Sequence, residues 1–235
     1  MKPVVINSPS LANSNLLELG SDVDTLYSLG VRWFHIDIMD GHYVPNICMP
    51  LRTVADIKGK YPDAVMDVHL MVTDPIAYVP RLKDAGVDYF SFHADSTSFP
   101  LRTLDTIKKA GMKGGVVINP GQSTDVIRPY ADMLDMVTMM AVEPGFAGQK
   151  FMERTVPRIL EVAKIRKEME LDFLINVDGA INYPNLIPSI KNGANVIVTG
   201  VFTIFKQPDG FDGAVRRFNS EVERGMSKGF AEGAY

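Results

Sequence analysis

The sequence predicts a single (β/α)8 barrel, and two observations support this fold class. Short runs of β-branched and apolar residues recur along the 235 residues, and each is followed by a polar turn and then an amphipathic stretch. Alternating elements of this kind force the strands to lie parallel, and eight parallel strands close most economically into a barrel. A doubly wound open sheet is the alternative, because periodicity alone does not report whether a sheet closes.

Each expected strand is built on an apolar run. In chain order the strands are VVINSPSL at 4–11, WFHIDIM at 33–39, AVMDVHLM at 64–71, YFSFH at 89–93, GGVVIN at 114–119, MVTMMAV at 136–142, FLINV at 173–177 and VIVT at 196–199. The first run is too short for a cleaved signal peptide and lacks a small-residue cleavage site, so it is interpreted as a strand.

The expected helices are the amphipathic stretches between these strands, at 16–29, 51–60, 75–85, 101–110, 123–131, 153–170, 183–192 and 212–225. Several end at a glycine, the usual stop signal before the next strand, as at Gly86, Gly111 and Gly193. Residues 1–225 therefore form the expected barrel domain. The remaining residues, 226–235, are small and polar with little periodicity, which predicts a flexible tail.

Composition limits the classes of function. Hydrophobic residues make up 46% of the chain and charged residues 22%, which is typical of a soluble globular protein. The formal net charge of -4 argues against a nucleic-acid partner, and no apolar run reaches the roughly 18 residues that a membrane span needs. Cys48 stands alone, so no internal disulfide can form, and a reducing cytoplasm is the expected location.

Chemistry-bearing residues lie on one face of two of the expected strands. Side chains two apart in a strand point to the same side, so His35, Asp37 and Met39 share a face. The strand at 64–71 repeats this arrangement with the set Asp67, His69 and Met71. A further carboxylate, Asp178, ends the strand at 173–177, and the carboxyl ends of barrel strands are where this architecture places catalysis.

Two imidazoles and two carboxylates from separate strands form a credible four-ligand site for one divalent metal ion, with Zn, Mn, Fe or Co all acceptable. The alternative is that His35 and His69 are core histidines bonded to backbone or carboxylate groups. Two strands each carry a histidine and an aspartate on the same face, and this repetition favours the metal site. His93 is expected either to support a ligand or to be structural, and His42 to lie in a loop.

The segments HIDIMDGHYVPN, DVHLMV, VEPGFAGQKF and NVDG closely resemble those of the ribulose-phosphate 3-epimerase family, and the similarity spans nearly the whole chain. The resemblance implies that D-ribulose 5-phosphate and D-xylulose 5-phosphate, sugars of the pentose phosphate pathway, are interconverted through an enediolate. It implies that His35, Asp37, His69 and Asp178 bind the metal, and that Asp37 and Asp178 are also the catalytic acid and base. The implied substrate contacts are Ser10, Met39, Met71 and Met140.

Phosphate binding is expected in glycine-bearing loops near the ends of the last strands, where barrels commonly hold phosphate on backbone amides. The candidates are Gly179, Ala180, Gly200 and Val201, joined by Gly148 from an earlier loop. Residues 144–150 predict a lid over the site, with Gly145 and Gly148 as its hinges. Glycines that only form turns are the alternative for each position.

Two positions depart from the family pattern. Ala180 stands where a second glycine is usual, and Gly200-Val201 replaces a glycine-serine pair before a longer PheThrIlePhe segment. These changes, with Ala147 in the lid, resemble the branch of the family that acts on D-allulose 6-phosphate, which is therefore the alternative substrate.

Two other classes of function compete with the epimerase hypothesis. A decarboxylase or aldol-type synthase on a similar barrel would need a lysine where Met39 stands. A non-catalytic protein that binds a sugar phosphate would gain nothing from carboxylates beside its anionic ligand. Since closed symmetric assemblies are common among enzymes, a homo-oligomer is expected.

Overall fold

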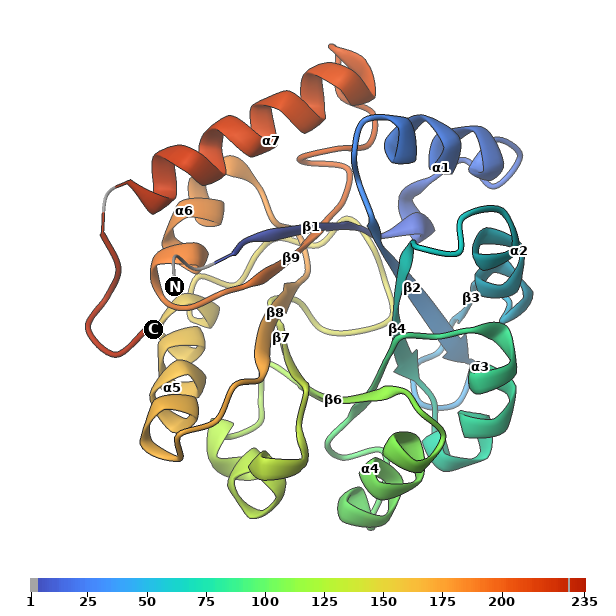
Figure 1. Ribbon diagram of the computed structural model, residues 1–235. Helices are drawn as coiled ribbons and strands as arrows, with labels where there is room; N and C mark the ends of the chain where they lie inside the picture. The colour runs from blue at the N-terminus through green and yellow to red at the C-terminus, as the bar shows by residue number, and fades with distance from the viewer. Residues whose placement is uncertain (1–3, 228) are drawn as a thin grey trace.

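The computed structural model describes residues 4–227 and 229–235, in which a ring of strands is surrounded by helices (Figure 1). The strands are β1 (Ile6–Pro9), β2 (Trp33–Asp40), β3 (Ile47–Cys48), β4 (Val65–Met71), β5 (Tyr89–His93), β6 (Lys113–Ile118), β7 (Met136–Met140), β8 (Leu174–Asp178) and β9 (Val196–Thr199). The α-helices are α1 (Leu19–Ser28), α2 (Arg52–Lys60), α3 (Val79–Ala85), α4 (Pro100–Lys109), α5 (Thr155–Glu168), α6 (Tyr183–Lys191) and α7 (Gly210–Met226). Short 3-10 helices complete the described elements: η1 (Leu11–Asn13), η2 (Pro75–Tyr78) and η3 (Thr124–Met133).

The strand order confirms the predicted barrel. Neighbours run β1-β9-β8-β7-β6-β5-β4-β2-β3, and every pairing is parallel except that of β3 with β2. A parallel bridge between Ser10 and His35 joins the end of β1 to β2 and closes the ring. The strands therefore follow one another around a circle, without the reversal of strand order that defines a doubly wound sheet.

Side-chain alternation separates a hydrophobic layer from a polar interior. Ile36 and Ile38 on β2 belong to the large apolar core, together with buried helix residues such as Leu26 and Ile57. The intervening residues His35 and Asp37 face the other side of the strand. This arrangement directs the titratable groups of β2 into the barrel.

Some local elements differ from the sequence prediction. The helix expected at 75–85 begins as the 3-10 helix η2 and becomes α-helical only at α3. The stretch expected to be a helix at 123–131 is the 3-10 helix η3, which contains Pro129 and has a non-helical residue at Tyr130. Proline lacks the N–H that an α-helix needs in its interior, which explains the kink. The two-residue strand β3 was not predicted, because two residues are too few to show alternation.

The end of the chain is packed against the barrel. The sequence predicts a flexible tail at 226–235, whereas Tyr235 donates its hydroxyl hydrogen to the Ala194 carbonyl at 3.0 Å, and Arg166 donates to the Ala234 carbonyl at 2.9 Å. Ala234 is fully buried, and Figure 1 shows the C-terminus beside α5 and α6. Residues 1–3 and 228, which fall in the expected domain and tail, lie outside the described residues.

Among the helices formed by residues 4–227 and 229–235, none is both long and apolar enough to span a bilayer.

Candidate active site

Four predicted ligands meet inside the barrel. The parallel register of β2 and β4 places Asp37 beside His69, and Asp178 ends β8. His35 Nε2 lies 3.4 Å from Asp37 Oδ1 and 3.6 Å from Asp178 Oδ2. His69 Nδ1 lies 3.3 Å and 3.2 Å from the same two oxygens.

These atoms fit one divalent ion. Ligands that surround a metal tetrahedrally at about 2.0–2.1 Å are separated from one another by about 3.4 Å, close to the four distances above. His35 Nε2 and His69 Nδ1 are buried and have no hydrogen-bond partner, an arrangement that is costly unless something else satisfies them. Two imidazole nitrogens and two carboxylate oxygens suit Zn, Mn, Fe or Co.

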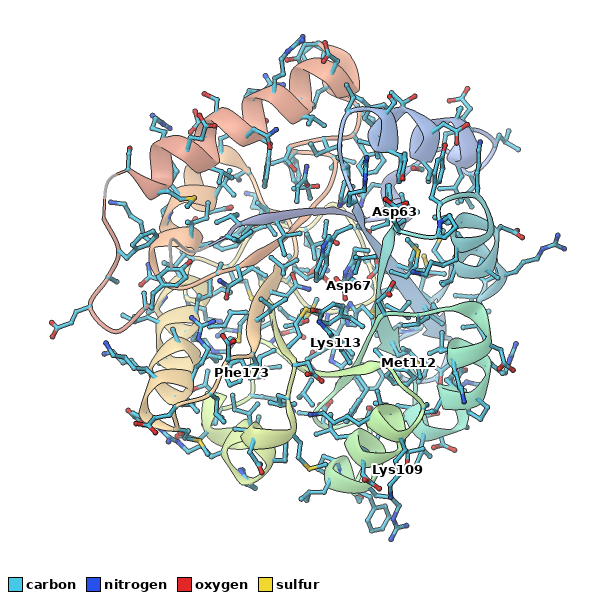
Figure 2. All side chains as sticks on the ribbon, viewed as in Figure 1. Asp63, Asp67, Lys109, Met112, Lys113 and Phe173 are labelled. Atoms are coloured by element: carbon cyan, nitrogen blue, oxygen red, sulfur yellow. The ribbon has the colours of Figure 1, made fainter. Side chains whose placement is uncertain are left out.

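The opposite nitrogen of each imidazole has a buried partner. His35 Nδ1 lies 2.8 Å from Asp67 Oδ2, and Figure 2 shows Asp67 inside the ring of strands. His69 Nε2 lies 2.8 Å from His93 Nε2. If His35 and His69 donate in these two bonds, their remaining nitrogens carry lone pairs that face the carboxylates. His93 was predicted either to support a ligand or to be structural, and its contact with His69 places it in a supporting position.

Burial and the charges of neighbouring side chains shift the pKa values of three groups in the site. Burial lowers the pKa of His35, but the carboxylates of Asp67 and Asp37 outweigh burial and raise that pKa well above its ordinary value. Burial raises the pKa of Asp37, but His35 and His69 outweigh it, so the net pKa is lowered. For His93, burial and the neighbouring His69 both lower the pKa, which favours a neutral ring.

Ser10 contacts a carboxylate instead of pointing freely into the cavity. Its Oγ donates to Asp37 Oδ2 at 2.7 Å, leaving Asp37 Oδ1 to face the histidines. The contact of Ser10 with the substrate stays a prediction; the structure shows its hydrogen bond to a predicted catalytic carboxylate, which restricts the rotation of that group.

One cavity joins this cluster to the predicted substrate residues. Asp37, His69 and Asp178 line it from the barrel side. It is lined by every residue predicted to contact the substrate: Ser10, Met39, Met71, Met140, Gly145, Gly148, Gly179, Ala180, Gly200 and Val201. Phe202 also lines the cavity; the sequence pointed to it only as the first residue of the PheThrIlePhe segment, and it was not predicted to contact the substrate.

The backbone at the far end of the cavity presents unpaired donors. Within the part of the chain that the structure describes, the N–H groups of Ala180, Val201 and Phe202 donate to no protein acceptor. Gly179 has φ of +116°, and a Cβ there would lie 2.7 Å from Val142 Cγ2, so this position requires glycine. Ala180, with φ of +52°, adopts the left-handed conformation that the usual glycine would adopt without strain.

The predicted lid is fixed at its base and exposed at its tip. Asn46 Nδ2 donates to the Gly145 carbonyl at 2.8 Å, and Gln149 Nε2 donates to the carbonyls of Glu143 and Phe146. The Phe146 side chain is 55% exposed although the residue lines the cavity. The loop therefore carries an unpacked aromatic side chain at the cavity mouth.

The decisive comparisons are with sequence relatives. Residues 6–205 match the model of the Ribulose-phosphate 3 epimerase family. Ribulose-phosphate 3-epimerase of Bacillus subtilis is 40% identical over 195 residues, covering 82% of this chain and 89% of that protein. The chloroplastic ribulose-5-phosphate-3-epimerase of Arabidopsis thaliana is 40% identical over 202 residues, covering 85% and 71%.

A solved structure supports the fold alone. The structure of 3-hexulose-6-phosphate synthase from Salmonella typhimurium aligns with a TM-score of 0.71 and 19% identity over 94% of this chain and 100% of that one. At 19% identity, this alignment carries no information on activity. The matched family model and the level of identity to its members establish that this chain belongs to the ribulose-phosphate 3-epimerase family.

Proposed function

We propose that the chain is a metal-dependent 3-epimerase of ketose phosphates that interconverts D-ribulose 5-phosphate and D-xylulose 5-phosphate. The observation that carries the proposal is the pair of carboxylates, Asp37 and Asp178, held beside two unpartnered imidazole nitrogens in the wall of one cavity. Family membership supports the reaction type.

The reaction inverts a carbon next to a ketone, which requires removal of its hydrogen as a proton. A divalent ion held by the four ligands would supply Lewis-acid stabilisation to the enediolate oxygens. One aspartate accepts the proton from one face of the carbon, and the other donates a proton to the opposite face. Asp37 and Asp178 suit these roles because they come from β2 and β8, on two sides of β1 and β9.

Other residues of the cavity support the same step. Ser10 holds one oxygen of Asp37 and so limits its rotation. The side chains of Met39, Met71 and Met140 line the cavity, and their thioethers provide a polarisable wall that excludes water from a planar intermediate. Packing in the core would by itself explain the presence of any one of these methionines.

The unpaired N–H groups of Ala180, Val201 and Phe202 are the proposed phosphate contacts. Backbone amides retain this capacity although Val201 has no hydroxyl. D-allulose 6-phosphate is the second candidate substrate, favoured by the altered loop after β9 and by Ala147 in the lid. A binding protein without activity is less supported, because Asp37 and Asp178 would repel an anionic ligand.

Exchange of the C3 hydrogen with deuterated water tests the proposal. Both ketose phosphates are supplied separately to the metal-loaded protein, and NMR measures deuterium incorporation and inversion. Incorporation with either substrate is expected, and the faster one identifies the preferred chain length. No incorporation with either substrate would leave a binding protein as the better description.

Substitution of Asp178 tests its individual role. Asp178→Asn is expected to lower the rate of inversion by about 10²–10⁴-fold, the usual contribution of a general acid or base. Asp172→Asn is the matched control, since Asp172 is exposed and precedes the same strand. Retention of most activity by Asp178→Asn, with the metal bound, would contradict the role.

The cytoplasmic location and the homo-oligomeric state of the protein stay predictions. Sedimentation measurements would test the oligomeric state.

A further inference from the structure

The loop that follows β9, residues 200–209, is held from outside the cavity by side chains that the proposed reaction does not use. Gln207 Nε2 donates to the carbonyl oxygens of Val201 at 2.6 Å and Phe205 at 3.2 Å. Gln207 Oε1 accepts from Arg217 Nη2 at 3.4 Å. Arg217 lies on α7, and its Nε donates to the Tyr183 hydroxyl of α6 at 3.0 Å. The two helices lie side by side in Figure 1.

Hydrogen bonds to two carbonyls of this loop set the direction of two consecutive peptide groups. In a planar trans peptide, the carbonyl and the N–H point in opposite directions. The Gly200 carbonyl accepts from the N–H groups of residues 203–205 at 2.9–3.2 Å, and the Val201 carbonyl accepts from Gln207. The N–H groups of these same two peptides belong to Val201 and Phe202, so both point away from the interior of the turn.

Those two N–H groups are available to a ligand. Val201 and Phe202 both line the cavity. Neither N–H donates to another group in the described chain, although the carbonyl in each of these peptides is hydrogen-bonded. A hydrogen-bonded carbonyl fixes the direction of the N–H in the same peptide. An anion binds best to N–H donors that are already oriented in this way.

We infer that Gln207 is a positioning residue that aims the N–H of Phe202 at the phosphate group of the substrate. The inference rests on the proposed function for the nature of that ligand. Without the side-chain amide of Gln207, the Val201 carbonyl loses its partner, and the peptide between Val201 and Phe202 is free to rotate. Rotation directs the N–H away from the phosphate, or turns an oxygen that repels phosphate toward it.

Gln207→Met tests this role, because methionine has a similar length but cannot donate a hydrogen bond. The KM for the ketose phosphate and the inhibition constant of inorganic phosphate are expected to rise together by about tenfold, the loss of one hydrogen bond to a charged group. The value of kcat is expected to stay within about twofold, since the peptide is remote from the reacting carbon.

Gln122→Met is the matched control. Gln122 also closes a turn, through a bond from Asn119 N to its Oε1 at 2.8 Å, but its loop does not line the cavity. This variant is expected to keep both constants. If Gln207→Met fails to fold, Arg217→Met tests the inference in its place. The Arg217→Met substitution leaves the side-chain donors of Gln207 intact but removes the arginine that binds the Gln207 side-chain oxygen. It is expected to raise both constants by a smaller factor.

The outcomes separate this inference from the proposed function. A Gln207→Met protein with lowered thermal stability but unchanged KM and phosphate inhibition would show that Gln207 only holds the loop together. A fall in kcat at constant KM would also overturn the inference. Failure of the wild-type protein to turn over either ketose phosphate would instead refute the proposed function.

Discussion

Substituting His93 by leucine tests how the second imidazole of the site is oriented. His69 Nε2 and His93 Nε2 lie 2.8 Å apart and both side chains are buried, so one nitrogen carries the hydrogen and the other accepts it. His69 can bind a metal through Nδ1 only if its own hydrogen is on Nε2. His93 therefore selects the competent form of His69 by accepting that hydrogen.

The magnitude follows from the lost acceptor. In His93→Leu the N–H of His69 stays buried without a partner, which costs about 1–3 kcal/mol. Each 1.4 kcal/mol corresponds to about tenfold in affinity, so metal binding is expected to weaken by about 10–100-fold. Competition between the protein and a chelator for Co²⁺ or Zn²⁺ measures the change. His93→Gln, whose side-chain oxygen can accept the same bond, is expected to recover much of the affinity.

His42→Leu is the control for this series, because His42 lies exposed in the loop after β2. A second measurement reports the proton directly: ¹⁵N NMR of the zinc-loaded protein should show His69 protonated at Nε2. A metal affinity of His93→Leu equal to that of wild type, or a spectrum with the proton on Nδ1, would refute the reasoning.

The remaining predictions concern the backbone after β8 and the dependence of metal binding on pH. Ala180→Gly is expected to stabilise the protein by up to about 1 kcal/mol, because glycine adopts a positive φ without strain. Gly179→Ala is expected to destabilise it, because the new Cβ would lie 2.7 Å from a side-chain carbon; thermal unfolding of both variants checks the signs. The raised pKa of His35 means that the metal-free protein loses the stabilisation from the protonated ring as pH rises through that pKa. Metal binding strengthens over the same interval, since the ion needs an unprotonated ring. The difference in melting temperature with and without metal should therefore widen with pH, and a constant difference would contradict the assignment of His35 as a ligand.

The barrel could be predicted because its signals are local. Alternation within β2 and β4 was visible in the sequence, and the parallel register then places Asp37 beside His69. The tail could not be predicted in the same way. Its contacts join Tyr235 and Ala234 to residues 41 and 68 positions away, and they depend on backbone carbonyls and one arginine, which leave no apolar period.

The sequence predicted which four residues would gather as candidate metal ligands, but not which of their atoms would face one another. Alternation also places Asp67 on the face of His69, but only the structure shows that Asp67 contacts His35 instead. The choice between the two nitrogens of an imidazole depends on a partner from another strand. Such a pairing is set by the register between neighbouring strands, which the pattern within a single strand does not encode.

The proposed phosphate contacts depend on backbone direction more than on side-chain identity. The sequence shows Val201 in place of a hydroxyl residue, which suggests a weakened site, yet the structure leaves the N–H groups of Val201 and Phe202 unpaired beside the cavity. Gln207 donates to the Val201 carbonyl on the opposite side of the peptide that carries the Phe202 N–H, and we infer that this bond sets the direction of that N–H. A loop that keeps its amides oriented can change its side chains and still bind an anion. If the proposed phosphate contacts are right, we expect the altered residues of this loop to affect the length of the substrate more than the binding of its phosphate.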